Sequence, residues 1–401
     1  MSTTDSIPAS TVPTRGASSV SIKLSRDDYA LRTGLVVVIS LLAILVVLPL
    51  YSLLSKSLED MDGNFVGLQN FQEYLQTPSL LTSITNSLSV AFFSAIIVLV
   101  LAFIYAYALT RTQMPFRLFF RGVALIPILA PSLLAAISLI YWFGTQGVLK
   151  SWLFGASIYG PIGVIMASCF WVFPHALMIL ITALSTADAR LYEAAEALRT
   201  SKWRIFWTVT LPGAKYGILS TGFIVFTLVI TDFGVPKVIG GNFNVLATDV
   251  YKQVVGQQNF EMGAVVSLVL LLPAVAAFIA DRWVQSKQVA ILSARAVPFQ
   301  PKSEPLRDWL LFGFCTTIAF IFLAMLGMAA YASFVTFWPY NLTLSLNNYD
   351  FDLMDGGGWE AYFNSIRMAI YCAVFGSGLI FFGSYLVEKA RGGSWLRTIL
   401  H

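Results

Sequence analysis

The chain contains 401 residues, of which 57% are hydrophobic and 11% are charged, and its formal net charge is +4. Soluble domains carry about 45–50% apolar and about 25% charged residues, so this composition excludes a soluble globular protein and predicts an integral membrane protein. The three cysteines lie within apolar runs, which argues against a disulfide framework, and two histidines are too few for a histidine metal cluster.

Residues 1–30 are the first predicted segment, a disordered cytoplasmic tail, because they are rich in Ser, Thr and Pro and contain no apolar signal-peptide core. Eight apolar runs follow, and each is long enough to cross roughly 30 Å of hydrocarbon. Several contain a proline, which membrane bundles tolerate when neighbouring groups bind the freed carbonyls. We therefore expect an all-α, polytopic helical bundle of about eight transmembrane helices. The runs are 34–54, 84–110, 119–143, 160–184, 214–235, 262–281, 309–333 and 365–387.

Basic residues are concentrated on one side of these predicted spans. With the N-terminus inside, the cytoplasmic segments hold twenty of the 25 Lys and Arg residues, and the external loops hold four. The positive-inside rule therefore predicts a cytoplasmic N-terminus. It also places the polar segment 191–212 on the cytoplasmic side.

That segment, LYEAAEALRTSKWRIFWTVTLP, is polar and basic and interrupts the apolar runs. Its apolar positions recur every three or four residues, which predicts two short amphipathic helices that end at Pro212. Such helices suit docking into a groove of another protein, and they also suit a position among lipid headgroups. Composition alone leaves both alternatives open. The apolar positions are Leu191, Ala194, Ala195 and Leu198 in the first helix and Ile205, Phe206 and Val209 in the second.

The order of residues in this segment resembles the EAA loop of permeases from ABC importers of the binding-protein-dependent type, which have the type I permease fold. The matching positions are Glu193, Ala194, Ala195, Ser201, Phe206, Leu211 and Pro212. In that family the loop forms a coupling helix that sits on the ATP-hydrolysing subunit, so the resemblance implies this role for residues 189–212. It implies further that Glu193 anchors the loop and that Trp203, Ile205 and Phe206 fill a groove of the ATPase.

Arg199 departs from the pattern of that family, which usually has glycine in the turn between the two helices. Glycine permits a left-handed turn at low cost. We therefore expect either a different turn at Arg199 or less typical coupling by this unit.

The chain also repeats itself at a constant offset of 278 residues. No gap is needed across these matches, which indicates a duplicated transport unit. The matching positions are Leu68–Phe71 with Leu346–Tyr349, Asn86–Leu88 with Asn364–Ile366, and Ala106, Tyr107 and Arg111 with Ser384, Tyr385 and Lys389.

From this repeat we expect a first permease unit at 31–285, with six transmembrane helices and the coupling loop at 189–212. A cytoplasmic linker at 286–308 leads to the start of a second unit at 309–401. A second EAA-like loop would lie beyond residue 401, so we expect a truncated or incomplete form of a fused permease. The alternative is a natural short permease that completes its pore with another chain.

The segment between the fifth and sixth runs, together with the fused layout, resembles permeases for 2-aminoethylphosphonate, which are related to fused iron(III) permeases. The resemblance extends over nearly the whole chain from about residue 30. It implies a permease subunit of an ATP-driven importer that takes up 2-aminoethylphosphonate from a periplasmic binding protein. Iron(III) or another small solute is the alternative. The resembling residues are 232–249 and 251–263.

Four polar residues are candidates for the substrate path. Asp232 lies near the outer end of a span and either faces the ammonium group of a solute or caps the following turn. Arg367 either binds a phosphonate or extends toward the membrane interface. Asn86 and Asn364 recur in both copies and either cap helix N-termini or contact the pore.

The chain contains no G-x-x-x-x-G-K-[ST] loop, so we expect no ATPase activity of its own and no cofactor, with ATP and Mg²⁺ bound by a partner subunit. A transporter driven by an ion gradient is the alternative in another class, but it would need buried acidic or histidine relays. The expected partners are ABC ATPase subunits, a periplasmic solute-binding protein, membrane lipid and a small solute, without nucleic acid. The expected location is the bacterial inner membrane.

Overall fold

The computed structural model describes residues 26–186, 188–288, 299–353 and 357–389, which are largely helical. Contacts group the chain into two compact units. The larger unit comprises residues 51–358, and the smaller unit combines residues 1–50 with residues 359–401. Each unit is a separate body.

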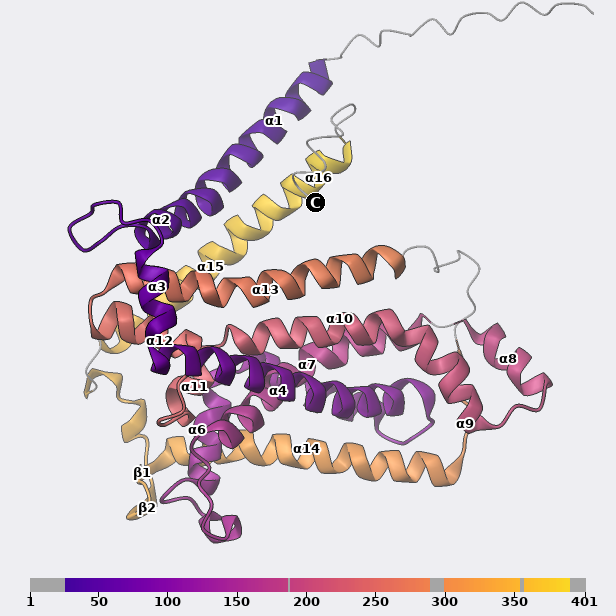
Figure 1. The fold of residues 1–401 in the computed structure, drawn as a ribbon. Coiled ribbons are helices and arrows are strands. Elements are labelled where there is room, and N and C mark those ends of the chain that lie inside the picture. The colour runs from indigo at the N-terminus through magenta and orange to yellow at the C-terminus, as the bar shows by residue number, and fades with distance from the viewer. Residues whose placement is uncertain (1–25, 187, 289–298, 354–356, 390–401) are drawn as a thin grey trace, which may run out of the picture. The chain divides into compact units, whose positions relative to one another are not determined.

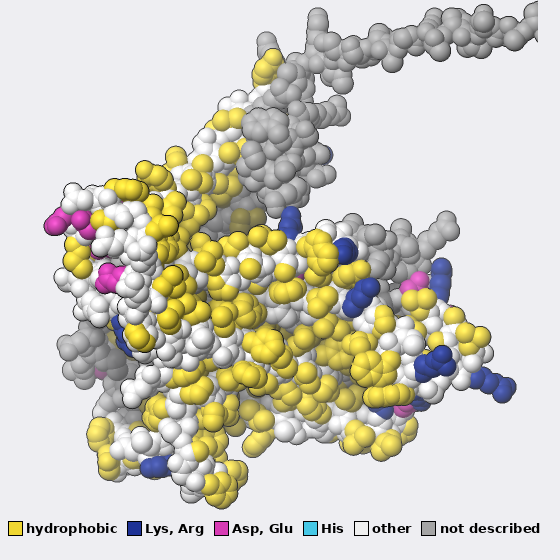
Figure 2. Space-filling view, in the orientation of Figure 1, with side chains coloured by type: hydrophobic (Ala, Val, Ile, Leu, Met, Phe, Trp, Pro, Cys, Tyr) yellow, Lys and Arg dark blue, Asp and Glu magenta, His cyan; other side chains and the backbone are white. Residues whose placement is uncertain are grey.

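Seven helices of the described residues are long and apolar enough to cross a membrane, and a bent pair of shorter helices is an eighth candidate. The predicted all-α bundle of about eight transmembrane helices is therefore confirmed. In the larger unit, Figure 1 shows long helices side by side, and Figure 2 shows hydrophobic side chains along them. These helices are α4 (Pro78–Arg111), α7 (Pro161–Ser185), α10 (Leu211–Ile230), α13 (Phe260–Gln288) and α14 (Pro305–Phe334).

The third predicted span, 119–143, is broken rather than straight. α5 (Arg117–Leu125) and a 3-10 turn (Ile126–Leu129) meet α6 (Ser132–Phe143) at an angle of 103°. A proline ring disfavours the helical conformation in the residue before it, and Ala130, which precedes Pro131, accordingly has an extended backbone.

The two ends of this bent pair lie at opposite ends of α14. Just before α5, the backbone N–H of Gln113 donates to Asp308 in the first turn of α14, at 3.3 Å. Just after α6, the side chain of Gln146 donates to the hydroxyl of Tyr340, beyond the end of α14, at 3.1 Å. The 30 residues of α14 rise about 45 Å, so the two ends of the bent pair contact regions that lie far apart along the bundle.

The core of the larger unit lies where α4, α7 and α10 meet. Buried alanines on α4 and α7, such as Ala102 and Ala176, let the helices approach closely, as is usual in membrane bundles. Gly217 of α10 faces Ala183 of α7, and a Cβ atom at Gly217 would lie 2.3 Å from that of Ala183. This crossing therefore requires glycine.

α14 packs in the same unit, against α4, α5 and α6. Its Phe322 ring meets the rings of Phe170 and Phe173 on α7 edge to face, with centroid distances of 4.9 and 5.1 Å. In terms of the 278-residue repeat, α14 corresponds to the first helix of the chain. A helix of the second copy thus packs on helices of the first, so the compact unit extends beyond residues 31–285.

Short elements close the larger unit at the end opposite α8 (Ala189–Ala197) and α9 (Lys202–Ile205) (Figure 1). Two strands there, β1 and β2, pair antiparallel, with Phe337 opposite Asn341. These elements are α3 (Gln69–Gln76), α11 (Gly234–Ile239), α12 (Leu246–Tyr251), β1 (Val335–Phe337) and β2 (Asn341–Leu344). Single 3-10 or π turns are Lys150–Leu153, Lys252–Gly256, Asn347–Tyr349 and Phe351–Leu353.

Both copies of the repeat carry the same asparagine contact. Asn70 Nδ2 donates to the carbonyl of Ser57 at 3.0 Å, and Asn348 Nδ2 donates to the carbonyl of Val335 at 2.8 Å. Val335 follows Ser57 by 278 positions, as Asn348 follows Asn70. In each copy the asparagine satisfies a carbonyl at the end of the preceding helix. At these positions the match in sequence is also a match in structure.

The smaller unit contains α1 (Arg26–Leu42), a π turn (Ala43–Val47), the start of α2 (Leu48–Ser57), α15 (Gly358–Tyr371), a second π turn (Cys372–Gly376) and α16 (Ser377–Lys389). α1 packs against α16, with Gly34 beside Leu386 and Gly383 beside Val38. α1 begins within the predicted tail, whose residues 1–25 lie outside the described residues.

Candidate functional site

The polar segment forms the two predicted helices, α8 and α9. Asp188 caps α8, because its Oδ1 accepts from the backbone N–H of Arg190 at 3.1 Å. Ser201 precedes α9 as its N-cap residue, with an extended backbone. The prediction that Pro212 ends the second helix is wrong, because α9 continues through a π turn (Phe206–Thr210) into α10. Leu211 and Pro212 begin α10 directly after this π turn, inside a helix that runs continuously from Lys202 to Ile230.

Arg199 adopts the left-handed conformation, with φ of 52°. The N–H of Thr200 donates to the carbonyl of Ala195 at 3.0 Å, and the N–H of Arg199 donates to that of Glu196 at 2.8 Å. This pair of bonds is the Schellman motif that closes many helices. The expectation of a different turn is therefore wrong, because arginine occupies the conformation that glycine would adopt. A side chain there costs about 1–2 kcal/mol.

One side of the loop packs onto the bundle. The hydroxyl of Tyr192 donates to Thr210 Oγ1 at 3.0 Å, and this bond is buried. Ile205 is also buried, and the Phe206 ring meets Phe103 and Tyr107 of α4 at centroid distances of 6.1 Å. The expectation that Ile205 fills a groove of another subunit is wrong, because its side chain is buried within this chain. Phe206 likewise faces α4.

The opposite side of the loop exposes apolar side chains. Leu191, Leu198 and Trp203 are 58%, 81% and 72% exposed. Ala194 is exposed between the two leucines, and Ala195 is partly buried. The Glu193 side chain is exposed and makes no hydrogen bond or ion pair with the described residues, so the structure gives no anchoring contact for it. This side is available to a partner surface.

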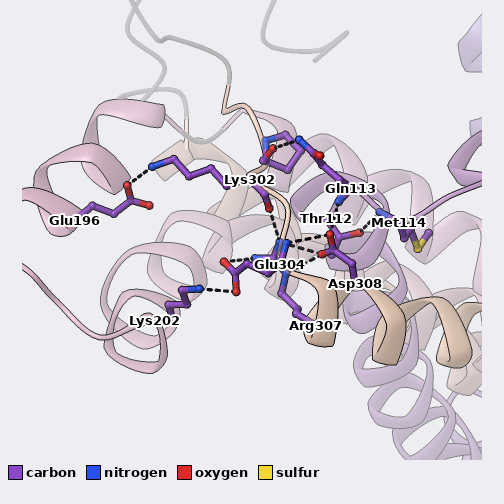
Figure 3. A network of polar contacts seen from close by, with 10 residues as sticks. Thr112, Gln113, Met114, Glu196, Lys202, Lys302, Glu304, Arg307 and Asp308 are labelled. Atoms are coloured by element: carbon purple, nitrogen blue, oxygen red, sulfur yellow. Dashed lines mark hydrogen bonds and ion pairs between the residues drawn. The ribbon is translucent and has the colours of Figure 1, made fainter.

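Ion pairs hold the loop to residues 299–308, which we call the strap (Figure 3). Lys302 pairs with Glu196 of α8, and Glu304 pairs with Lys202 of α9 at 2.6 Å. The hydrogen bond from Lys302 to the Glu196 carboxylate raises the pKa of Lys302. Both helices of the loop are thereby joined to the segment that leads into α14. Of the rest of the predicted linker, residues 286–288 belong to α13, and residues 289–298 lie outside the described residues.

The strap is in turn held to the bundle. Arg307 pairs with Glu304 at 3.0 Å and with Asp308 at 3.1 Å. The buried carboxylate of Asp308 accepts from the backbone N–H groups of Gln113 and Glu304 (Figure 3). Gln113 also donates from its side chain to the carbonyl of Pro301 at 2.7 Å. The strap therefore connects the loop, the turn after α4, and α14.

Arg111 is a residue whose position the sequence did not predict. It is buried at the end of α4, and its Nη2 donates to the carbonyl of Leu184 at 2.8 Å. Its guanidinium carbon lies 4.9 Å from the ring centre of Tyr192 and 4.3 Å from that of Phe299. One side chain thus contacts α7, α8 and the strap. The one signal for this residue in the sequence is that Arg111 matches the basic residue Lys389 in the 278-residue repeat.

Asp232 serves as a helix cap. Its Oδ2 accepts from the backbone N–H of Val235 at 3.0 Å, which caps α11, and its Oδ1 accepts from Ser132 Oγ at 3.0 Å. Burial raises the pKa of this carboxyl. The capping alternative is therefore confirmed, and the same carboxylate joins α11 to the start of α6.

Asn86 and Asn364 do not cap helices, so that prediction is wrong. α4 begins two turns before Asn86, at Pro78, and proline favours the first position of a helix. Asn86 Nδ2 donates instead to the carbonyl of Asn244, at 2.9 Å. Asn364 lies inside α15, where it accepts from the exposed Arg367 at 3.4 Å. The two asparagines therefore make different contacts, Asn86 with the backbone of Asn244 and Asn364 with the side chain of Arg367.

A buried acid that the sequence did not single out is Asp249 on α12. It is 5% exposed, and α12 packs against α4. Burial raises the pKa of its carboxyl, and Ser83 and Lys252 partly oppose this. Within the described ranges, no three His, Cys, Asp or Glu side chains gather in a way that would hold a metal ion.

The loop lies within the part of the chain that matches a known protein family. Residues 99–289 match the family described as binding-protein-dependent transport system inner membrane component. A putative ferric transport system permease, FbpB 1 of Haemophilus influenzae, is 27% identical over 92% of this chain and 60% of its own length. FbpB of Actinobacillus pleuropneumoniae is 25% identical over 92% of this chain and 55% of its own length. The chain thus spans little more than half the length of these two relatives.

A shorter relative is matched over most of its length. The probable sulfate transport system permease cysT of Chlorella vulgaris is 30% identical over 51% of this chain and 80% of its own. Among solved structures, a bacterial alginate ABC transporter in complex with an alginate pentasaccharide-bound periplasmic protein has a similar chain. Its TM-score is 0.51 at 15% identity, over 68% of this chain and 98% of that one. At this identity the similarity concerns the fold alone.

Proposed function

We propose that this chain, which belongs to the family of binding-protein-dependent transport system inner membrane components, forms the path of a small solute through the membrane in an ATP-driven importer. The loop at 189–212 carries this proposal. It lies between two long apolar helices and exposes Leu198 and Trp203 on the side away from the bundle.

A separate ATPase subunit would bind this exposed side. Apolar side chains on one face of a short helix are the usual anchors in a groove of a partner protein. Leu191, Ala194 and Leu198 share such a face on α8, and Trp203 lies on α9. ATP and Mg²⁺ would be bound in that partner, and the remaining positions of the loop would hold its shape.

Motion of the ATPase would reach the bundle by two routes. α9 is continuous with α10, so a displacement of the loop moves a membrane-spanning helix directly. The strap carries the same displacement to α14 through the ion pairs of Lys302 and Glu304. Nucleotide and solute would shift the equilibrium between inward and outward states only through contacts that differ between those states.

Iron(III) is the solute we favour. The two relatives that align with 92% of the chain are ferric transport permeases. The expectation of 2-aminoethylphosphonate finds no support among the relatives. The Asp232 carboxylate, which was one candidate partner for its ammonium group, accepts instead from the backbone N–H of Val235 in α11. A periplasmic binding protein would deliver the solute at the end formed by α3, α11, α12 and the β1–β2 hairpin.

Uptake measurements test this proposal. Cells that carry the complete transport operon, with and without this gene, are supplied with labelled iron(III) or labelled 2-aminoethylphosphonate. We expect loss of iron uptake on deletion, and restoration by the wild-type gene. Loss of aminophosphonate uptake alone would refute the iron assignment, and uptake that persists without any ATPase subunit would refute the ATP-driven mechanism.

A further inference from the structure

Three arginines line a cavity of about 440 Å³ beside the loop. Arg111 comes from the end of α4, and Arg117 and Arg121 come from α5. Residues four apart on a helix are neighbours, so Arg117 and Arg121 lie on one side of α5. No Asp or Glu lines this cavity among the residues that the structure describes. The cavity therefore carries positive charge without a matching carboxylate.

Arg111 supplies a buried donor that lacks a partner. Its side chain is 3% exposed, and its Nε makes no hydrogen bond. The guanidinium contacts the rings of Tyr192 and Phe299 and the carbonyl of Leu184, but no carboxylate among the described residues. A buried charge without a counter-ion is costly, so an anion in the cavity would stabilise this arrangement.

The remaining walls are apolar and lie where membrane helices end. Leu109, Leu118 and Ile181 line the same cavity, and α4 and α7 both end beside it. Leu118 is 83% exposed, and Phe119 next to it is 55% exposed. A soluble anion would make no favourable contact with these apolar side chains. A lipid combines an anionic group, which suits the arginines, with acyl chains, which suit the apolar walls.

We propose that this cavity binds the phosphate group of an anionic phospholipid. Arginine binds phosphate oxygens with paired, charge-assisted hydrogen bonds, and basic pockets between membrane helices are typical lipid headgroup sites. The acyl chains lie along Leu118 and Phe119. Because Arg111 also contacts Tyr192 of α8, the bound lipid holds the base of the coupling loop in place.

Native mass spectrometry of the purified protein tests this site. The protein is mixed with phosphatidylglycerol or with phosphatidylcholine of the same acyl chains. We expect the protein to retain phosphatidylglycerol in preference to phosphatidylcholine. In the double variant Arg117→Gln/Arg121→Gln, the affinity for phosphatidylglycerol should fall roughly tenfold or more, because each basic residue near a headgroup increases the affinity by a factor of about five. Lys215→Gln/Lys287→Gln removes the same charge outside the cavity and should change the affinity less than about twofold.

Equal loss of affinity in both double variants would overturn the proposal, because it would indicate general attraction to charge. Full displacement of the lipid by inorganic phosphate would also overturn it, in favour of a soluble anion. The Arg121 side chain is exposed and makes no hydrogen bond with the described residues, so Arg121→Gln alone should fold normally and still weaken binding about fivefold. Unchanged binding in a folded Arg121→Gln protein would exclude the site.

Discussion

The hydroxyl groups of Tyr192 and Thr210 are hydrogen-bonded at 3.0 Å, and the bond joins α8 to the π turn that leads into α10. We expect Tyr192→Phe to lower the free energy of unfolding by about 1 kcal/mol. It should also reduce uptake, because α8 would follow α10 less closely. Thermal unfolding in detergent and uptake assays measure these two effects. In a double-mutant cycle with Thr210→Val the losses should not add, and additive losses would contradict a direct link.

Arg199→Gly should stabilise the loop. The left-handed conformation at φ of 52° costs a residue with a side chain about 1–2 kcal/mol relative to glycine, although glycine loses more backbone entropy on folding. We expect a net gain of up to about 1 kcal/mol in unfolding free energy, with uptake retained. Arg199→Val is the contrasting variant, since a β-branched residue fits this conformation poorly. A stability ranking with valine above glycine would argue against the turn.

Trp203→Asp should prevent binding of the ATPase while the permease still inserts and folds, because the side chain is 72% exposed. The measurement is co-purification of the ATPase together with uptake. Trp152→Asp is the matched control, since Trp152 is 68% exposed and lies in the loop before α7. We expect Glu193→Lys, on the exposed side of α8, to abolish uptake too. Normal uptake in both loop variants would refute the assignment of this loop to coupling.

Gly217→Ala should force α10 away from α7, because the new Cβ atom would lie 2.3 Å from that of Ala183. Overpacking of this kind costs about 1–3 kcal/mol. Gly213→Ala, on the same helix with nothing within 4 Å, is the control and should be neutral or slightly stabilising. Ala183→Gly should rescue the first variant, and failure of that rescue would mean that the strain arises elsewhere.

Asp249→Asn should change how stability depends on pH. Burial holds the pKa of Asp249 above its ordinary value of 3.8, so the folded protein favours the protonated carboxyl. The stability that this group contributes is fully present below pH 3.8 and is lost as the pH rises through the raised pKa. We therefore expect the variant to gain stability relative to wild type at neutral pH and to lose this advantage in acid. Melting temperatures of both proteins across this range provide the test, and a constant difference would count against it.

Prediction from the sequence succeeded where the signal is local. The long apolar runs indicated the membrane helices, and the spacing of apolar positions indicated α8 and α9. The match of Asn70 with Asn348 also appeared in the structure, as two equivalent contacts with the end of a preceding helix. Prediction failed at Asn86, because the start of α4 is decided by Pro78, two turns earlier.

The sequence by itself determined that this chain is a bundle of membrane helices with a polar helical loop, because hydrophobicity and periodicity are properties of neighbouring residues. Only the tertiary structure decided which side of the loop is exposed, because Ile205 is buried and the Phe206 ring packs against Phe103 of α4, which is distant in sequence. The ion pairs between the loop and the strap, and the buried position of Arg111, join segments far apart in the chain. Such contacts arise from long-range packing, which no local pattern encodes.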